Sequence, residues 1–397
     1  MKQKVISVTL NIILIFYFFT AFFNVIGISR NVVVISLSSF LIIWGLLNKN
    51  KKNGRDYRFD SLYYFLFCSV FVFFISLTLK DPFIVFLGWV SAILNLVVWM
   101  VVFYASKDKD NVLYKFKKVF ALCVVASAVL GIYQYFVDAS IFGFVQNTYG
   151  DEATMSKENV TRRVVAFMGA PQNYSVAIGI GLFVIYDVFY KSKSPLFYPF
   201  IVVAVIGGLL SGGRAFGIFL IAFAGMFFIG KKKNILSILI LAVIFLGVFY
   251  FAGDFLTSSG ESTSRAFNFH FDNWLALQIV MSSISTLSLF DWLFGTGFGF
   301  DVWLESNGTV ALSYDFVESH VICLLLEGGL FLATAYLLPV FSSIRLGFKN
   351  KSVYTFMILC LLVDAFCTPA FSGFPVSFMA WPFIIDELCV KKRNDNK

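Results

Sequence analysis

Apolar runs of about membrane-crossing length recur along this chain, and they constrain its fold more than any other feature. A helix needs roughly 20 apolar residues to cross about 30 Å of hydrocarbon. Hydrophobic residues make up 59% of the 397 residues and charged residues only 14%, whereas a typical soluble domain has roughly 25% charged residues. This composition excludes a water-soluble fold, and the length of the runs predicts helices rather than barrel strands.

The runs predict an all-α, polytopic membrane protein with about 12 transmembrane helices in a single membrane domain, residues 1–397. The first run continues into further spans without a small-residue cleavage site, so we expect a first membrane helix and not a signal peptide. The predicted spans lie near 5–23, 31–47, 60–79, 83–105, 118–137, 172–190, 196–211, 214–230, 235–252, 318–344, 352–367 and 374–390.

The positive charges fall mainly in alternate connections between the runs. Under the positive-inside rule, this pattern places the N- and C-termini in the cytoplasm, and it explains the net charge of +8 better than nucleic-acid binding does. Most of the basic residues on the outer side are Arg, which binds phosphate through two parallel hydrogen bonds. Of the 31 Lys and Arg residues, the outer ones are Arg30, Lys80, Lys157, Arg162, Arg163, Arg214 and Arg265.

Two outer loops, 138–171 and 253–317, are much longer than the other connections, and long loops often carry function. Within the second loop, residues 264–274 predict an amphipathic helix at the membrane interface. This helix would place Arg265, Asn268 and Asp272 on one face. It either anchors the loop or presents Arg265 to a substrate.

Cysteine usage predicts neither a disulfide framework nor a zinc site. The six cysteines lie within apolar runs, and none forms a C-x-x-C pair. We interpret them as small hydrophobic side chains and predict no metal and no other cofactor.

Two outer segments place arginine beside a predicted helix start. Arg162 and Arg163 come shortly before Pro171 and Asn173, and proline is favoured at the first position of a helix. The turn Ser211–Arg214 contains two glycines, which allow close approach of a ligand to the backbone. The alternatives are a solvated arginine pair and a tight turn with an interfacial arginine.

Two further segments combine glycine with polar residues near the tenth span. Gly295–Gly299 lacks the G-K-[ST] sequence of a nucleotide loop, so we expect a flexible bend that returns the loop to the membrane. His320 and Glu327 are two helical turns apart, which places both on one stripe about 10 Å apart along the axis. An acid within a membrane helix is usually functional or paired. His320 would act as a general base or a hydrogen-bond donor, or it is a satisfied interfacial residue.

The order of these segments resembles the O-antigen polymerase and O-antigen ligase superfamily, with the Wzy-type repeat-unit polymerases favoured. The resemblance covers roughly residues 120 to 345. An arginine-x10-glycine pattern of some polymerase loops is not evident in 138–171. The segments that carry the resemblance are Arg163 with Gly169, Pro171 and Asn173, the turn Ser211–Arg214, Arg265 ahead of Gly295–Gly299, and His320 with Glu327–Gly329.

The resemblance implies a metal-independent glycosyltransferase on the periplasmic face of the bacterial inner membrane. Its substrate would be an oligosaccharide on undecaprenyl diphosphate, and its further partners a chain-length regulator and a flippase. His320, Arg265, Arg214 and Glu327 would be catalytic. Arg162, Arg163 and Asn173 would bind substrate.

Two rival functions stay open at this point. A ligase would use the same donor with a different acceptor, and the shared motifs do not separate it from a polymerase. A transporter or flippase for lipid-linked oligosaccharide would instead place charged residues along the membrane midplane.

Overall fold

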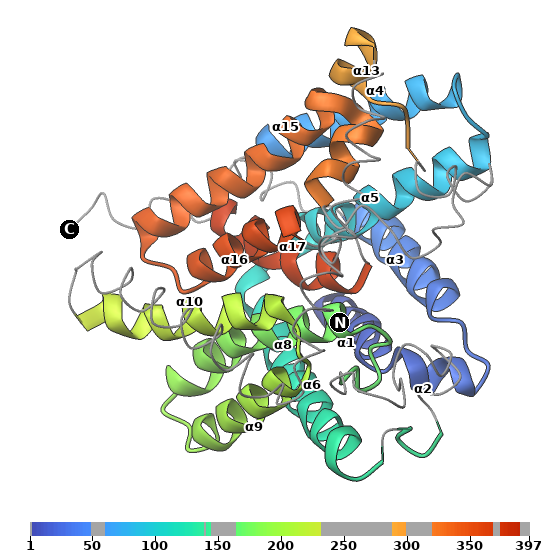
Figure 1. Ribbon diagram of the computed structural model, residues 1–397. Helices are drawn as coiled ribbons and strands as arrows, with labels where there is room; N and C mark the ends of the chain where they lie inside the picture. The colour runs from blue at the N-terminus through green and yellow to red at the C-terminus, as the bar shows by residue number, and fades with distance from the viewer. Residues whose placement is uncertain are drawn as a thin grey trace, which may run out of the picture. The chain divides into compact units, whose positions relative to one another are not determined.

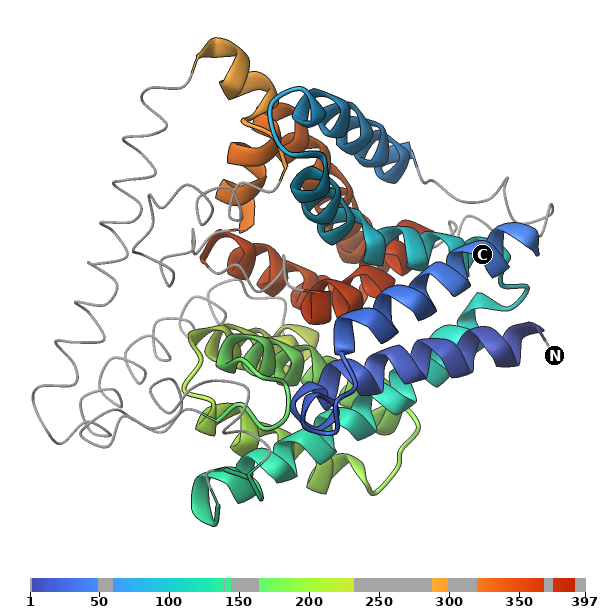
Figure 2. The same ribbon diagram turned by 90° about the vertical axis from the view of Figure 1, so that its right-hand side faces the viewer.

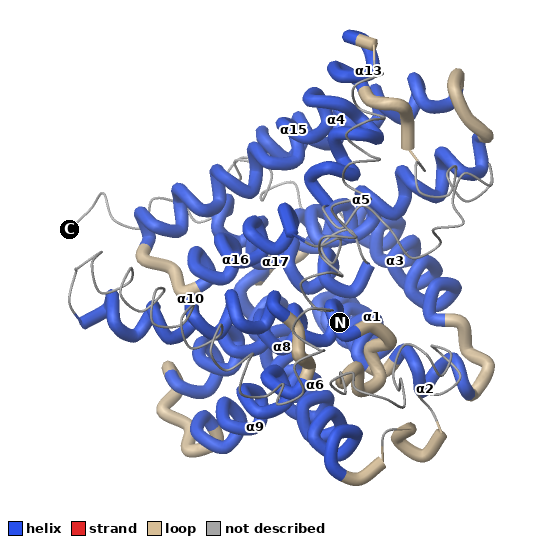
Figure 3. The backbone as a smooth tube through the Cα atoms, viewed as in Figure 1, coloured by secondary structure: helices blue, strands red, loops and turns tan. Residues whose placement is uncertain are grey.

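The computed structural model describes residues 2–48, 60–138, 140–143, 164–231, 288–298, 320–367 and 374–389. Within these ranges every regular element is a helix, as predicted, and Figure 3 shows no strand in them. Six helical stretches in these described ranges are long and apolar enough to cross a membrane. The elements are α1 (Lys2–Phe18), α2 (Thr20–Val25), α3 (Arg30–Leu47), α4 (Asp60–Leu77), α5 (Pro82–Ala105), α6 (Lys109–Phe136), α8 (Pro171–Ile185), η2 (Tyr186–Tyr190), α9 (Phe197–Leu210), α10 (Arg214–Lys231), α13 (Leu289–Phe294), α15 (His320–Asn350), α16 (Tyr354–Cys367) and α17 (Phe374–Cys389).

Each predicted span coincides with described helix except 235–252, which lies outside the described residues. The first span is divided at Phe19 into α1 and α2. Helix α6 begins at Lys109, well before the predicted start at 118. Its start is set by Asp108, whose carboxylate accepts a hydrogen bond from the Asn111 amide at 3.1 Å. A polar N-cap therefore extends the helix beyond its apolar run.

The contacts divide the chain into two compact units, whereas the sequence predicts one membrane domain. Unit 1 comprises Met1–Asn50 and Val101–Ala266, and unit 2 comprises Lys51–Met100 and Phe267–Lys397. The long loops at 138–171 and 253–317 belong largely to the ranges outside the described residues.

In unit 1, α6 packs against α1, α8 and α9, and α8 packs against α10 (Figure 1). Two glycines make room for the Tyr174 side chain of α8 where these helices cross. A β-carbon at Gly131 of α6 or Gly207 of α9 would come within 3 Å of the Tyr174 hydroxyl oxygen. Small residues at both crossings therefore make room for one large aromatic side chain.

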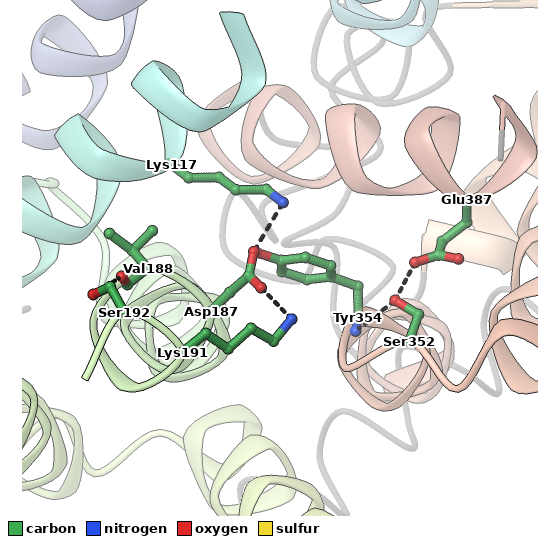
Figure 4. Close-up of polar contacts among 8 residues, drawn as sticks. All are labelled: Lys117, Asp187, Val188, Lys191, Ser192, Ser352, Tyr354 and Glu387. Carbon is green, nitrogen blue, oxygen red and sulfur yellow. Dashed lines mark hydrogen bonds and ion pairs between the residues drawn. The ribbon is translucent and has the colours of Figure 1, made fainter. Parts of the chain in front are cut away.

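A charged cluster joins α6 to the π-helical segment η2 (Figure 4). The Lys117 ammonium lies 3.0 Å from one carboxylate oxygen of Asp187, and the Lys191 ammonium contacts the other. The side chains of Lys117 and Asp187 are only 11% and 16% exposed. Asp187 therefore lies between two lysines in unit 1.

In unit 2, α15 packs against α4, α13, α16 and α17 (Figure 1). Pro382 lies inside α17, and a proline leaves the carbonyl four residues earlier without its helical donor. That carbonyl belongs to Phe378, and the Trp99 indole N–H donates to it at 2.8 Å. On the other side of α17, Ser352 donates to the buried carboxylate of Glu387 (Figure 4).

Helix α15 is broken at Gly329, where φ is 62° and ψ is −166°. We call residues 320–328 the short arm and residues 330–350 the long arm; both are drawn in orange in Figures 1 and 2. The rings of His320 and Tyr336 are 4.9 Å apart, whereas an unbroken helix would separate these positions by about 24 Å along its axis. The short arm thus folds back along the long arm. The prediction of one continuous helix over 318–344 is wrong, because two adjacent glycines permit this reversal.

Candidate active site

The short arm of α15 ends on a separate piece of chain, residues 295–298, which we call the glycine turn. The Thr296 amide donates to the Leu326 carbonyl at 2.7 Å, and the Gly297 amide donates to the Glu327 carbonyl at 2.9 Å. The Thr296 hydroxyl also donates to the Leu326 carbonyl, at 3.0 Å. Carbonyls at a helix C-terminus lack partners within the helix. The glycine turn supplies those partners in a part of the protein that is shielded from water.

Two glycines allow the backbones to approach this closely. Gly295 has φ of 78°, and a β-carbon there would lie 2.3 Å from the carbonyl carbon of Glu327. A β-carbon at Gly329 would lie 2.3 Å from the carbonyl carbon of Leu293. Any other residue at these two positions would adopt a strained backbone conformation with positive φ, and its β-carbon would clash with the neighbouring backbone. The sequence predicts a flexible bend here; in the structure, residues 295–298 are hydrogen-bonded to the end of the short arm, and Gly299 lies outside the described residues.

The C-terminal end of α4 and Lys80, just beyond it, also bind the glycine turn. The Lys80 ammonium donates to the Gly297 carbonyl at 2.7 Å, and the Phe298 amide donates to the Ser76 hydroxyl oxygen at 2.9 Å. Sequence reasoning did not single out Lys80. The available signal was that Lys80 and Lys157 are the only two lysines among the seven outer basic residues.

Helix α13 leads into the glycine turn and fixes its direction. Ser288 and Asp291 form a capping box at the start of α13, in which each side chain accepts from the other residue's amide. At the end of α13, the Phe294 ring packs against Phe71 of α4 and Phe331 of the long arm, with centroids 5.7 and 5.8 Å apart.

Unit 1 anchors the segment that follows the predicted arginine pair. The side-chain oxygen of Gln134 in α6 accepts from the amides of Val165 and Ala166 at 3.0 and 2.8 Å. The amide of Ala21 in α2 donates to the Phe167 carbonyl at 2.9 Å. Residues 164–170 are consequently an ordered, buried approach to α8 and not a solvated loop.

The same region contains the turn Ser211–Arg214. The Val164 amide donates to the Leu210 carbonyl directly before this turn, at 3.3 Å. A β-carbon at Gly213 would lie 2.6 Å from the Ser175 side chain of α8. Two of the four predicted segments thus meet in unit 1, beside the starts of α8 and α10. Neither helix has an acidic residue in its own first turn, where such a residue would offset the positive end of the helix dipole.

The structure locates only some of the predicted site residues. His320 is buried, with 6% exposure, and Glu327 is half-buried at the end of the short arm. Asn173 is half-buried in the first turn of α8. Arg214 begins α10, and its side chain lies outside the described part of the structure. The other three, Arg162, Arg163 and Arg265, and the predicted helix 264–274 also lie outside it.

Possible metal ligands do not gather in the ranges that the structure describes. Within them, no group of three His, Cys, Asp or Glu side chains is arranged to hold a metal ion. Among the five cysteines whose side chains the structure describes, none forms a disulfide, and Cys68, Cys123, Cys360 and Cys389 are buried.

No protein-family model matches this chain. Comparison with curated proteins gives no match either. A functional assignment therefore rests on the residues and contacts described above.

Proposed function

We propose that this membrane protein is a glycosyltransferase-type polymerase that joins undecaprenyl-diphosphate-linked oligosaccharide units into O-antigen or capsular polysaccharide. The observation that supports this proposal is the direct contact between two of its motifs. The glycine turn of the G-x-G-x-G segment caps the short arm that carries His320 and ends in E-G-G. Segments about 30 residues apart in the sequence thus meet at the end of the helix arm that carries His320 and Glu327.

In the proposed reaction, a hydroxyl oxygen of a fresh lipid-linked unit attacks the anomeric carbon of the growing chain. A new glycosidic C–O bond forms, and the bond to the undecaprenyl diphosphate breaks with the electron pair leaving on the diphosphate. His320 takes the hydroxyl proton or donates a hydrogen bond to the phosphate. Arg214 and Arg265 stabilise the departing charge, with Arg162, Arg163 and Asn173 binding substrate. This chemistry requires no metal or other cofactor.

The proposed topology has about 12 spans, cytoplasmic termini and the reaction on the outer face of the bacterial inner membrane. It is supported by the positions of the basic residues and by six helical stretches of sufficient length. A C-terminal green fluorescent protein should fluoresce, and alkaline phosphatase inserted in the 253–317 loop should be active. The reverse result would overturn the orientation.

A flippase or transporter is the alternative from another class, and the broken helix α15 is a feature that such proteins also use. Transporters offer the carbonyls of a broken helix to an ion or a substrate. Here the Leu326 and Glu327 carbonyls already accept hydrogen bonds from the glycine turn, which favours an enzyme. A ligase with the same donor remains the rival within the enzyme class.

The deciding experiment removes the gene and complements it with the wild type or with His320→Ala, Arg214→Ala or Arg265→Ala. Surface polysaccharide and lipid-linked intermediates are then separated on gels. A polymerase leaves single repeat units on the carrier and no ladder. Long polymer stranded on the carrier indicates a ligase, and no intermediate on the outer face indicates a flippase. Normal polymer from a variant present at wild-type abundance would remove that residue from the site.

A further inference from the structure

Lys80 makes a contact that none of the motifs anticipates. Lys80 lies just beyond the C-terminal end of α4, and its ammonium donates to the Gly297 carbonyl at 2.7 Å, across 217 positions of sequence. The Gly297 amide in turn donates to the Glu327 carbonyl at 2.9 Å. The same peptide turn thus joins a cation to the C-terminal end of the short arm.

Electrostatics favours a cation at this position. The last carbonyls of a helix carry partial negative charge, and a nearby cation stabilises them most strongly in poorly solvated surroundings. A hydrogen bond from a charged donor also polarises the acceptor peptide, which strengthens the bond that its own N–H makes. The Lys80 contact therefore strengthens the capping of the short arm.

The short arm is held at both of its ends. It contains about two and a half turns, and isolated helices of that length are unstable. Its two fixed ends are the contact of His320 with Tyr336 and the capping of Leu326 and Glu327 by the glycine turn. If the glycine turn no longer capped Leu326 and Glu327, the backbone of the short arm would be released. That backbone sets the position of His320 against Tyr336.

We propose that Lys80 is a positioning residue: it holds the glycine turn in the break of α15 and thereby fixes the short arm with His320 and Glu327. This inference rests on the proposed function where it concerns catalysis, but the positioning itself has a separate physical readout. The amides of Thr296 and Gly297 exchange with solvent hydrogen only when the glycine turn leaves the short arm.

The test measures hydrogen–deuterium exchange on the purified full-length protein together with polymer formation in cells. Lys80→Met should accelerate exchange of the Thr296 and Gly297 amides by about tenfold or more, because a hydrogen bond to a charged group is lost. Exchange of the Val165 and Ala166 amides in unit 1 should not change. Polymer should fall at unchanged membrane abundance.

Three variants control for other effects. Lys80→Arg keeps a charged donor and should restore both slow exchange and polymer. Lys118→Met makes the same change at an exposed lysine of α6 and should behave as wild type. If Lys80→Met does not accumulate, Thr296→Val removes only the hydroxyl donor to Leu326 and should give a smaller increase in exchange at the same two amides.

Unchanged exchange at Thr296 and Gly297 in Lys80→Met would overturn the proposal, even if polymer were lost. Faster exchange with normal polymer would also overturn it, because the position of the short arm would not matter to the reaction. If His320→Ala also leaves polymer and intermediates normal, the proposed function fails, whereas the exchange data still decide whether Lys80 holds the glycine turn.

Discussion

The imidazole of His320 meets the phenol ring of Tyr336 edge to face, with ring centroids 4.9 Å apart and the ring planes at 78°. Tyr336 also packs against Phe65 and Trp381, at 5.6 and 5.9 Å. The candidate catalytic histidine is therefore set into an aromatic cluster of unit 2, and it does not stand at the exposed start of a span. The reversal at Gly329 makes this contact possible, so the reversal is the first feature to test.

Gly329→Ala should unfold the short arm locally and abolish polymer formation. At φ 62° and ψ −166° the backbone lies in a region that essentially only glycine adopts, so alanine costs about 1–3 kcal/mol there; the new methyl group would also meet the Leu293 backbone. Gly225→Ala in α10 is the matched control, since a β-carbon there has no atom within 4 Å. The control should be neutral or stabilising by about 0.5–1 kcal/mol. Thermal unfolding and polymer gels of both variants provide the measurement; equal behaviour would contradict the required backbone reversal.

Trp99→Phe should destabilise unit 2 by about 1–3 kcal/mol, because it removes the indole donor to the Phe378 carbonyl in a buried site. Pro382→Ala supplies a helical N–H for the same carbonyl. We therefore expect Trp99→Phe to cost much less in a Pro382→Ala background than alone. Denaturation midpoints of the four proteins form the double-mutant cycle. Additive losses would show that the indole acts only through packing.

Asp187→Asn should destabilise unit 1 by about 3 kcal/mol, because it leaves Lys117 poorly solvated without its opposite charge. Adding Lys117→Met should recover most of the loss. Lys191→Met removes the more exposed partner, whose side chain is 55% exposed, and should cost less than about 1 kcal/mol. A larger effect of Lys191→Met than of Lys117→Met would reverse the assignment of the buried pair.

Hydrogen bonds from the side chain of Ser140 and the amide of Phe142 hold the pKa of the Asp138 carboxyl below its ordinary value. The ionised carboxylate therefore stabilises this turn at pH values above the ordinary pKa of about 3.9. That contribution is lost as the pH falls through the lowered pKa. After correction for intrinsic rates, protection of the Phe142 amide from exchange should be constant near neutrality and decrease only in that acidic range. Asp138→Asn should show no such step.

Much of the helical architecture could be predicted from the sequence, because a run of apolar residues and its flanking charges are local features. The starts and ends of helices were harder to predict where polar residues extend a helix beyond its apolar run, as at Asp108 and Lys109. The reversal of α15 was missed for a different reason. Gly328 and Gly329 permit a reversal, but the contacts that stabilise it come from residues 295–298 and from α4.

For the candidate site, sequence reasoning found the segments but not their pairing. It placed Gly295–Gly299 and Glu327–Gly329 near one span, and it treated one as a bend and the other as part of a straight helix. Their backbone hydrogen bonds depend on two separate stretches meeting, which no spacing along the chain encodes. Gln134 was missed likewise, since a single amide in a long apolar helix gives no sign that it holds two amides of a distant segment.

The contact between Lys80 and Gly297 also bears on the order in which the protein is made. Helix α4 leaves the ribosome early, whereas its partner turn is synthesised 217 positions later. Meanwhile the Ser76 hydroxyl is satisfied within α4, where it donates to the Val72 carbonyl at 2.7 Å, and Lys80 at the end of the helix can stay in water. Residues 295–298 precede the short arm in the chain, so the partners of the Leu326 and Glu327 carbonyls are already synthesised when these residues emerge. It is α4 that waits, and the joined unit of α4, glycine turn and short arm can form only after Glu327 has been made.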